Sequence, residues 1–156
     1  LVVTYLELHG FKDEVFAHNH PGGSLGRKML TTIGDLMHTG EQVPIVYENS
    51  DLSVIISEMT QKRLGVTLIT NKKKQLKGII TDGDLRRMIE DKKDISKIRA
   101  LDLSKSFPKW LEQNNLATKA VQLMEEYSIT SLVVSANGKK IDGIIHLHDL
   151  LKAGII

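Results

Sequence analysis

The stretch GIITDGDL at residues 78–85 recurs without a gap as GIIHLHDL at residues 143–150. The offset is 143 − 78 = 65 residues, and the same register aligns 64–70 (LGVTLIT) with 129–135 (ITSLVVS). A repeat of this length in only two copies is too short for a solenoid. The sequence therefore predicts two similar modules that pack on each other, with any ligand site in the cleft between them.

The composition is that of an ordinary globular protein. Of the 156 residues, 41% are hydrophobic and 26% are charged, and the net charge is only +2. Such a chain can bury a core as one compact domain or as two small ones. Its basic residues are dispersed in short groups such as 72–74, which indicates no nucleic-acid partner. The absence of cysteine excludes disulfides and thiolate metal sites and fits a cytoplasmic protein, and no apolar run is long enough to span a bilayer.

The hydrophobic periodicity predicts the same α/β order, strand–helix–strand–strand–helix, in each module. In the first module the strands are expected at 43–46, 66–70 and 76–81 and the helices at 51–63 and 82–90. In the second module the strands are expected at Trp110, 131–135 and 141–146 and the helices at 117–127 and 147–153.

Three local signals refine this order. Ser50 and Asn115 are expected to cap the first helix of each module, because their side-chain oxygens can accept from first-turn amides. The Asn-Gly pair within 136–139 supplies positive φ for a tight hairpin turn.

The N-terminal segment differs from the two modules. Residues 1–8 read as the end of an apolar helix that stops at Gly10, and the glycine-rich stretch 18–27 reads as a tight loop. The chain starts without methionine or a signal-peptide pattern, which predicts a piece of a longer protein. We therefore expect a preceding-domain remnant with linker at 1–33, a first module at 34–98 and a second module at 99–156.

Paired modules of this order, with the Gly-apolar-apolar-Thr-x-x-Asp turn, resemble the CBS (cystathionine-β-synthase) domain pair over residues 35–156. Four further motifs in register resemble the C-terminal half of the bacterial D-arabinose 5-phosphate isomerases, at 20–27, 35–38, 81–87 and 146–154. In that family a sugar-isomerase (SIS) domain precedes two CBS modules related by pseudo-two-fold symmetry. The resemblance implies a parent enzyme that interconverts ribulose 5-phosphate and arabinose 5-phosphate toward the lipopolysaccharide sugar Kdo or capsular relatives.

The resemblance implies that Thr81 and Asp84 bind the ribose of a nucleotide. A hydroxyl and a carboxylate three residues apart at a helix start can both face a sugar diol, and first-turn amides there favour a phosphate. The alternative is that Thr-x-x-Asp forms only a capping box, which needs no ligand.

In the second module, His146 and His148 replace the threonine and the glycine of this turn while Asp149 remains. This predicts an altered second site rather than two equivalent nucleotide sites. A His-x-His-Asp cluster could bind a metal, but imidazoles at such turns more often make ordinary hydrogen bonds. We therefore expect no metal there.

Four basic residues flank the first turn. Arg86 and Arg87 follow Asp84, and Lys62 and Arg63 end the preceding helix. Guanidinium groups match carboxylates and phosphates, so Arg63, Arg86 and Arg87 are candidates for an acidic ligand, with Arg86 favoured. For Lys62 we favour a helix-terminal charge that binds no ligand.

His20, in the motif His-Pro-Gly-Gly, matches the active-site histidine of the isomerase family. An imidazole that titrates near neutrality suits acid/base work at a sugar. The resemblance implies that this chain lacks the lysine and glutamates that complete the site, so His20 is expected to be inert here.

Two functions follow as hypotheses. The first is a regulatory module of the isomerase that binds a nucleotide or nucleotide-sugar, with CMP-Kdo suggested by pathway logic, ATP or AMP open, and no cofactor required. The second is a purely structural module, because the resemblance implies flat CBS homodimers that could hold a tetrameric parent together. Catalysis by this chain alone is not expected, because it has no phosphate-cradling loop, nucleophile elbow or paired carboxylates outside the repeats.

Overall fold

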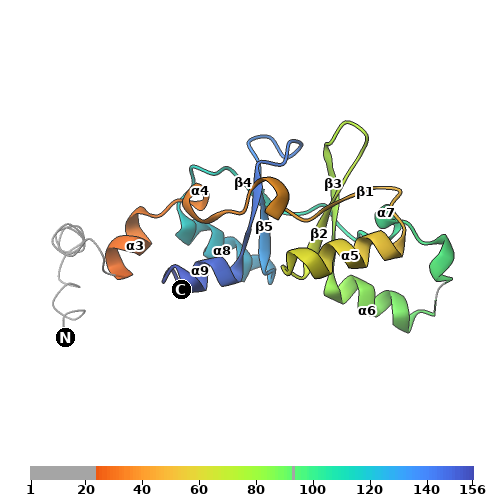
Figure 1. Cartoon of the computed structure of the whole chain (residues 1–156). Helices are drawn as coiled ribbons and strands as arrows, with labels where there is room; N and C mark the ends of the chain where they lie inside the picture. The colour runs from red at the N-terminus through yellow and green to blue at the C-terminus, as the bar shows by residue number, and fades with distance from the viewer. Residues whose placement is uncertain (1–23, 93) are drawn as a thin grey trace.

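The structure is a computed structural model, and it describes residues 24–92 and 94–156. Two three-stranded sheets form its centre, with helices on one side and two hairpin loops projecting from the other (Figure 1). The segment expected at 1–8, the expected loop up to residue 23, and His20 lie outside the described residues. Within the described part of the chain, no helix is long and apolar enough to cross a membrane.

The first module contains the predicted order of elements. These are β1 (Ile45–Tyr47), α5 (Leu52–Lys62), β2 (Val66–Thr70), β3 (Leu76–Thr81) and α6 (Asp82–Glu90). β2 is the central strand, parallel to β1 and antiparallel to β3.

The second module repeats this topology with shorter strands. Its elements are β4 (Trp110–Leu111), α8 (Ala117–Tyr127), β5 (Ser131–Val134), β6 (Gly143–His146) and α9 (Leu147–Lys152). β5 is parallel to β4 and antiparallel to β6. The α/β fold with two like modules, predicted from the repeat, is confirmed.

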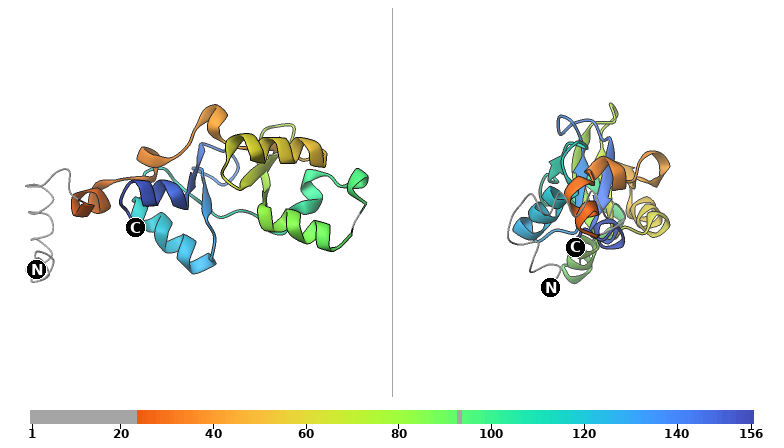
Figure 2. Two further views of the ribbon diagram at one scale, coloured as in Figure 1. Left: turned by 60° about the horizontal axis from the view of Figure 1, so that its bottom comes forward. Right: turned by 90° about the vertical axis from the view of Figure 1, so that its left-hand side faces the viewer.

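Five short elements lie outside this repeated core. They are α3 (Ser24–Leu30), α4 (Ile33–Leu36), α7 (Ala100–Leu103) and the 3-10 helices η1 (Gly40–Gln42) and η2 (Ile95–Lys97). Figure 2 shows that α3 extends beyond the second module, at the end of the molecule opposite α6.

The short helices α4 and α7 each pack into the core of a module other than the one that follows them in the chain. Ile33 is fully buried among residues of α8, β5 and β6, and its N–H donates to the Asn115 carbonyl at 2.8 Å. Ala100 is fully buried among residues of β1, α5 and β3, and its N–H donates to the Ser50 carbonyl at 2.9 Å. The packing units therefore interlock across the division at 98/99 drawn from the sequence.

A third apolar layer joins the two sheets. It contains Leu68 of β2 and Leu76 of β3 together with Val133 of β5 and Ile144 of β6, and each is at most 3% exposed. Because both sheets contribute to one dry layer, the space that remains between the modules is confined to the edges of this layer.

Both N-cap predictions are wrong. The cap of α5 is Asp51, whose side chain accepts from the Val54 N–H at 3.1 Å, while Ser50 Oγ accepts from the Tyr47 N–H. α8 starts after Leu116 without a side-chain cap, and Asn115 Nδ2 donates backwards to the Glu112 carbonyl. Neighbouring polar residues compete for such positions, and a pattern does not rank them.

The hairpin turn of the second module is also longer than predicted. Only Gly138 has positive φ, at 77°, because Asn137 uses its side-chain oxygen to accept from the N–H groups of Lys139 and Lys140. Such an Asx-type loop replaces the two-residue turn, and β6 starts at Gly143 rather than at Ile141.

Candidate functional site

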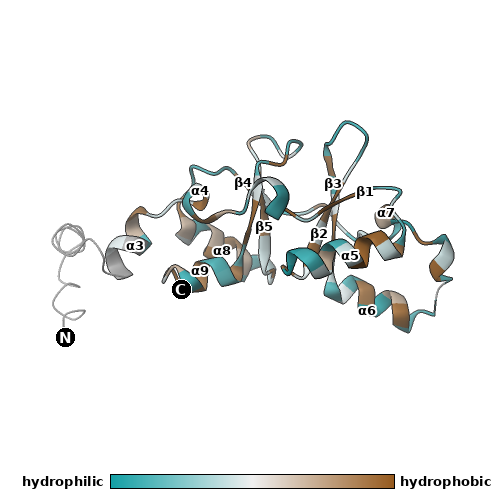
Figure 3. Ribbon diagram, in the orientation of Figure 1, coloured by the Kyte–Doolittle hydropathy of each residue, from teal (hydrophilic) through white to brown (hydrophobic). Residues whose placement is uncertain are grey.

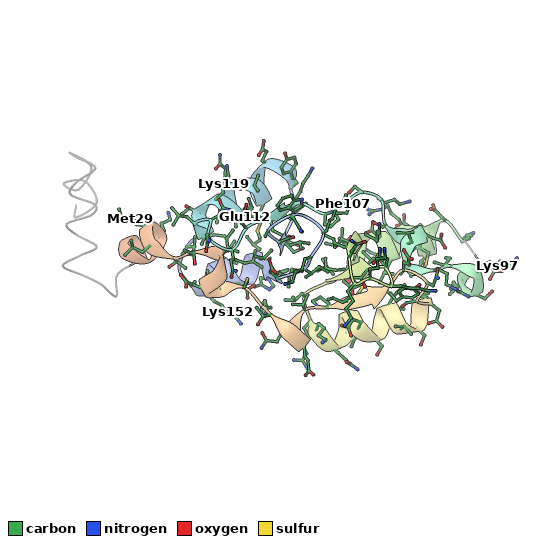
Figure 4. All side chains as sticks on the ribbon, turned by 90° about the horizontal axis from the view of Figure 1, so that it is seen from above. Met29, Lys97, Phe107, Glu112, Lys119 and Lys152 are labelled. Atoms are coloured by element: carbon green, nitrogen blue, oxygen red, sulfur yellow. The ribbon has the colours of Figure 1, made fainter. Side chains whose placement is uncertain are left out.

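A cleft of about 640 Å³ opens at one edge of the junction between the modules. The start of α6 and the adjoining strands form one wall, and the end of α8 with the segment 105–109 forms the other. Figure 4 labels Phe107, which belongs to this segment and lies between the two modules. The lining residues are Val66, Ile79, Thr81, Asp84, Arg86, Arg87, residues 105–109 and residues 127–131.

Thr81 and Asp84 form a capping box and also line the cleft. Asp84 Oδ2 accepts from the Thr81 N–H at 2.8 Å and from Thr81 Oγ1 at 3.1 Å. Thr81 Oγ1 in turn accepts from the Asp84 N–H at 3.3 Å. The cap expected as the alternative to binding therefore exists, but it leaves both side chains at the surface of the cleft.

An identical motif elsewhere shows what the cap alone looks like. Thr32 and Asp35 at the start of α4 form the same box, with an Asp35 Oδ2 to Thr32 N–H distance of 2.9 Å. Neither residue lines the cleft. Thr-x-x-Asp is therefore a helix cap at both places, and only the surroundings of Thr81 and Asp84 offer a ligand site.

The charge of the cleft is strongly positive. Asp84 is 7% exposed and is the one carboxylate among its lining residues, and its Oδ1 forms an ion pair with Arg87. The Arg87 side chain is 56% exposed, so it can turn toward a ligand at little cost in packing. Four basic side chains face this one acid, namely Arg86, Arg87, Lys105 and Lys109.

Lys105 and Lys109 were not foreseen from the sequence. They lie in a segment without periodic hydrophobicity, between α7 and β4, and no motif marks them. Lys109 Nζ lies 4.3 Å from the centre of the Tyr127 ring, a cation–π contact that holds it beside the cleft.

Arg63 does not join Arg86 and Arg87. It ends α5 in a left-handed conformation, with φ of 61°, and lines a separate hollow of about 500 Å³ with His146 and His148. Lys62 lies 3.7 Å from Glu58 and also contacts the Glu41 carbonyl. Lys62 therefore makes its polar contacts within the first module.

His38, for which the sequence predicted no role, contacts the strand-to-helix turn of the second module through Asp149. Asp149 Oδ2 accepts from the His146 N–H at 2.8 Å, and Asp149 Oδ1 lies 2.8 Å from His38 Nε2. Because a carboxylate can only accept, His38 Nε2 carries the proton. The backbone of His38 pairs with Ile144 in both directions, at 2.8 and 3.1 Å, which fixes the ring at this place.

His146 acts as the N-cap of α9 in place of a threonine. Its Nδ1 accepts from the His148 N–H at 3.0 Å. Burial is the main cause that lowers the pKa of His146 below 6.5, and His148 and His38 lower it further while Asp149 opposes the shift. The lowered pKa favours the neutral ring, which is the form that can accept this hydrogen bond.

The described residues include no group of three or more histidine, aspartate or glutamate side chains arranged to hold a metal ion. The rings of His146 and His148 are 4.5 Å apart between centroids and tilted by 60°. Asp149, the third member of the cluster, is shared between the His146 backbone and His38.

The repeat register shows how far the second edge of the junction differs from the cleft. Residues 105–109 (KSFPK) align with 40–44 (GEQVP), and Arg86 aligns with Leu151. Here the segment forms η1, and the Glu41 carbonyl is bound by Lys62. The second edge thus has no counterpart of Arg86, Lys105 or Lys109, although Lys152 aligns with Arg87 and Arg63 lines the hollow beside His146 and His148.

Comparison with known proteins now identifies the family. The CBS domain pattern matches residues 33–91 and again residues 102–155. This chain belongs to the CBS domain family. Its two modules are a tandem CBS pair, as the repeat and the Gly-apolar-apolar-Thr-x-x-Asp turn indicated.

The curated relatives are isomerases. Arabinose 5-phosphate isomerase KdsD of Yersinia pestis is 42% identical over all 156 residues of this chain, which cover 47% of that relative. The same enzyme of Escherichia coli K12 is 40% identical over the same span. The CBS pair described here therefore spans about half the length of the curated relatives it matches.

Solved structures share the fold. CBSX2 in complex with AMP superposes with a TM-score of 0.68 at 21% identity, over 80% of this chain and 96% of that one. At this level of identity the likeness shows a common CBS-pair fold.

Proposed function

We propose that the cleft binds a nucleotide or nucleotide-sugar and that this CBS pair regulates a sugar-phosphate isomerase. The observation that carries the proposal is the meeting of Thr81 and Asp84 with four basic side chains in one cleft. The activity of the parent as an arabinose 5-phosphate isomerase is proposed from the names of the relatives. Ribulose 5-phosphate as the other sugar and a cytoplasmic location are proposed from the family resemblance and from the absence of cysteine.

The chemistry of the cleft fits the three parts of a nucleotide. The Asp84 carboxylate can accept from the two hydroxyls of a ribose once exposed Arg87 turns away. Apolar side chains for a base are also present, from Val66, Ile79 and Ile129. The remaining basic groups suit phosphate, because guanidinium and ammonium groups both bind it.

Adenine nucleotides and CMP-Kdo are both candidates. AMP is the ligand named for CBSX2, and CMP-Kdo adds to its ribose and phosphate a second acid for the basic side chains. The cleft volume of about 640 Å³ lies within the range of small-molecule sites.

Isothermal titration of this chain with AMP, ATP, CMP and CMP-Kdo tests the proposal. Asp84→Ala should abolish binding in the cleft or weaken it there by at least about tenfold, because a charge-assisted contact to the sugar is lost. Asp35→Ala is the matched control, because it removes the same type of capping box outside the cleft. Absence of heat with all four compounds, or equal losses in both variants, would reject a nucleotide role for the cleft.

A second candidate function is assembly, as suggested by apolar side chains on the surface of the first module. Val54 and Ile56 of α5 and Ile89 of α6 are 46–66% exposed, and Figure 3 shows hydrophobic residues along both helices. Such a surface favours a homodimer through the CBS modules within a tetrameric parent. Sedimentation equilibrium of Ile56→Asp/Ile89→Asp should then show loss of the dimer, with Leu116→Asp, exposed in the other module, as control.

A further inference from the structure

A second concavity, the hairpin hollow, lies where the two hairpin loops meet the segment that connects the modules. Its volume is about 510 Å³. It is lined by Gln75–Lys77 of the first hairpin, Phe107 and Trp110 of the connecting segment, and Asn137–Lys139 of the second hairpin. The hairpin loops project from the same side of the molecule in Figure 1, so three segments distant in sequence build one surface.

The hollow is held in shape by backbone contacts between its parts. The Leu76 N–H donates to the Lys139 carbonyl at 2.7 Å, which ties one hairpin to the other. Ser135 Oγ accepts from the Gly138 N–H at 2.9 Å, which fixes the second loop. A Cβ on Gly138 would lie 2.7 Å from Trp110 Nε1, so the indole rests directly against the loop. A ligand would therefore meet a preformed surface.

Two large aromatic rings are open to solvent at the hollow. Trp110 is 37% exposed and Phe107 is 48% exposed. Exposed aromatic rings that gather at a concavity are typical of binding sites rather than of ordinary surface. Phe107 also lines the cleft, so the two concavities are neighbours that share one side chain.

The hollow is also positively charged. Lys77 and Lys139 line it, and its lining includes no carboxylate. The same two loops carry further exposed lysines at 72–74 and 140. Exposed lysines gathered on one side of a concavity raise the local concentration of anions.

We propose that the hairpin hollow is a second small-molecule site, which binds a phosphate-bearing compound with a flat or apolar ring face. The ring would pack on Trp110 and Phe107, because indole and phenyl faces take up flat apolar groups. The phosphate would lie between Lys77 and Lys139. A nucleotide and a sugar phosphate share this chemistry. The proposal does not depend on nucleotide binding in the cleft.

Trp110 is the single tryptophan of the sequence, so its fluorescence reports on the hollow. The whole chain is titrated separately with AMP, ribose 5-phosphate and inorganic phosphate. We expect AMP or ribose 5-phosphate to change the emission with saturation, and inorganic phosphate to bind at least about tenfold more weakly, since it has no ring to bury. A response to AMP alone assigns a nucleotide, and a response to both assigns the sugar phosphate portion.

Variants separate the hollow from the cleft. Lys77→Ala/Lys139→Ala should weaken the response by at least about tenfold, whereas Lys72→Ala/Lys73→Ala, outside the hollow on the same hairpin, should change it by less than about threefold. Asp84→Ala, which disables the cleft, should leave the response intact. No saturable change with any compound overturns the proposal, as does a response that Asp84→Ala abolishes and Lys77→Ala/Lys139→Ala preserves.

Discussion

At the scale of single residues, the same motif performs different work in different surroundings. Thr32-x-x-Asp35 and Thr81-x-x-Asp84 are both capping boxes, yet only the second lines a cleft with basic side chains. The sequence could predict the motif and both of its readings. It could not predict Lys105, Lys109 and His38, because their roles depend on contacts between segments that share no local pattern.

The two boxes should also contribute similarly to stability. Asp84→Ala and Asp35→Ala should each lower the free energy of unfolding by about 1 kcal/mol, the usual cost of a lost N-terminal cap. Urea denaturation measures both. A loss several times larger for Asp84→Ala would mean that its pair with Arg87 stabilises the fold more than a partly exposed ion pair normally does.

The pKa of His146 makes a pH dependence testable. Burial lowers the pKa of His146 in the folded state below 6.5, His148 and His38 lower it further, and Asp149 opposes the shift. As the pH falls, His146 is therefore protonated in the unfolded chain before it is protonated in the folded chain. It lowers the free energy of unfolding progressively from about pH 6.5 down to its folded-state pKa, and it has no effect above that range.

His146→Thr, which restores the residue of the first module, should flatten that dependence. A threonine can cap α9 as Thr81 caps α6, but it does not titrate. Urea denaturation between about pH 5 and pH 7.5 should show a smaller loss of stability on acidification than in the unaltered chain. An unchanged slope would show that other histidines, not His146, carry the effect.

At the scale of the elements, hydrophobic periodicity predicts the bounds of the longer helices and strands. The bounds of β2, β3, α6 and α8 match the predicted ones. β3 alternates between core and solvent and α6 and α8 each bury one face, whereas β2 is buried along its whole length. The first strand lies at 45–47 rather than at 43–46. Val43 belongs to the apolar layer between the sheets, so its hydrophobicity reflects packing between modules rather than a strand.

The loop of the second hairpin depends on one glycine. Gly138→Ala should destabilise the chain by about 1–3 kcal/mol, because it adds strain at positive φ and a clash with Trp110. Gly40→Ala is the control, since Gly40 also has positive φ but no atom lies within 4 Å of the added Cβ. Thermal unfolding should show the larger shift for Gly138→Ala. Equal shifts would mean that the indole moves aside freely.

At the scale of the whole molecule, the short helices α4 and α7 interlock the two modules. The bridges Thr32–Leu116 and Asp51–Arg99 lie at corresponding places of the two modules, each joining one module to the segment that enters the other. The repeat predicted two modules, but it could not predict this exchange, because α4 and α7 are too short for a periodic signal.

Ile33→Ala tests the exchange. Ile33 precedes the first module in sequence, yet it is fully buried in the core of the second, so its truncation should cost about 2–5 kcal/mol. Leu30→Ala, at a 71% exposed position, should have little effect. Trp110 fluorescence, which reports on the second module, should show the loss. A loss confined to signals from the first module would contradict the packing described.

We propose that one of the two edges of the junction is a nucleotide site and that the other, where His146 and His148 stand in place of the threonine and glycine, is not. The stoichiometry of AMP or CMP-Kdo binding in the cleft tests it most directly, by isothermal titration of Lys77→Ala/Lys139→Ala, in which the hairpin hollow is disabled. We predict a single equivalent per chain, lost in the same background with Asp84→Ala and kept with Asp35→Ala. Two equivalents, or one equivalent that survives Asp84→Ala, would contradict the account.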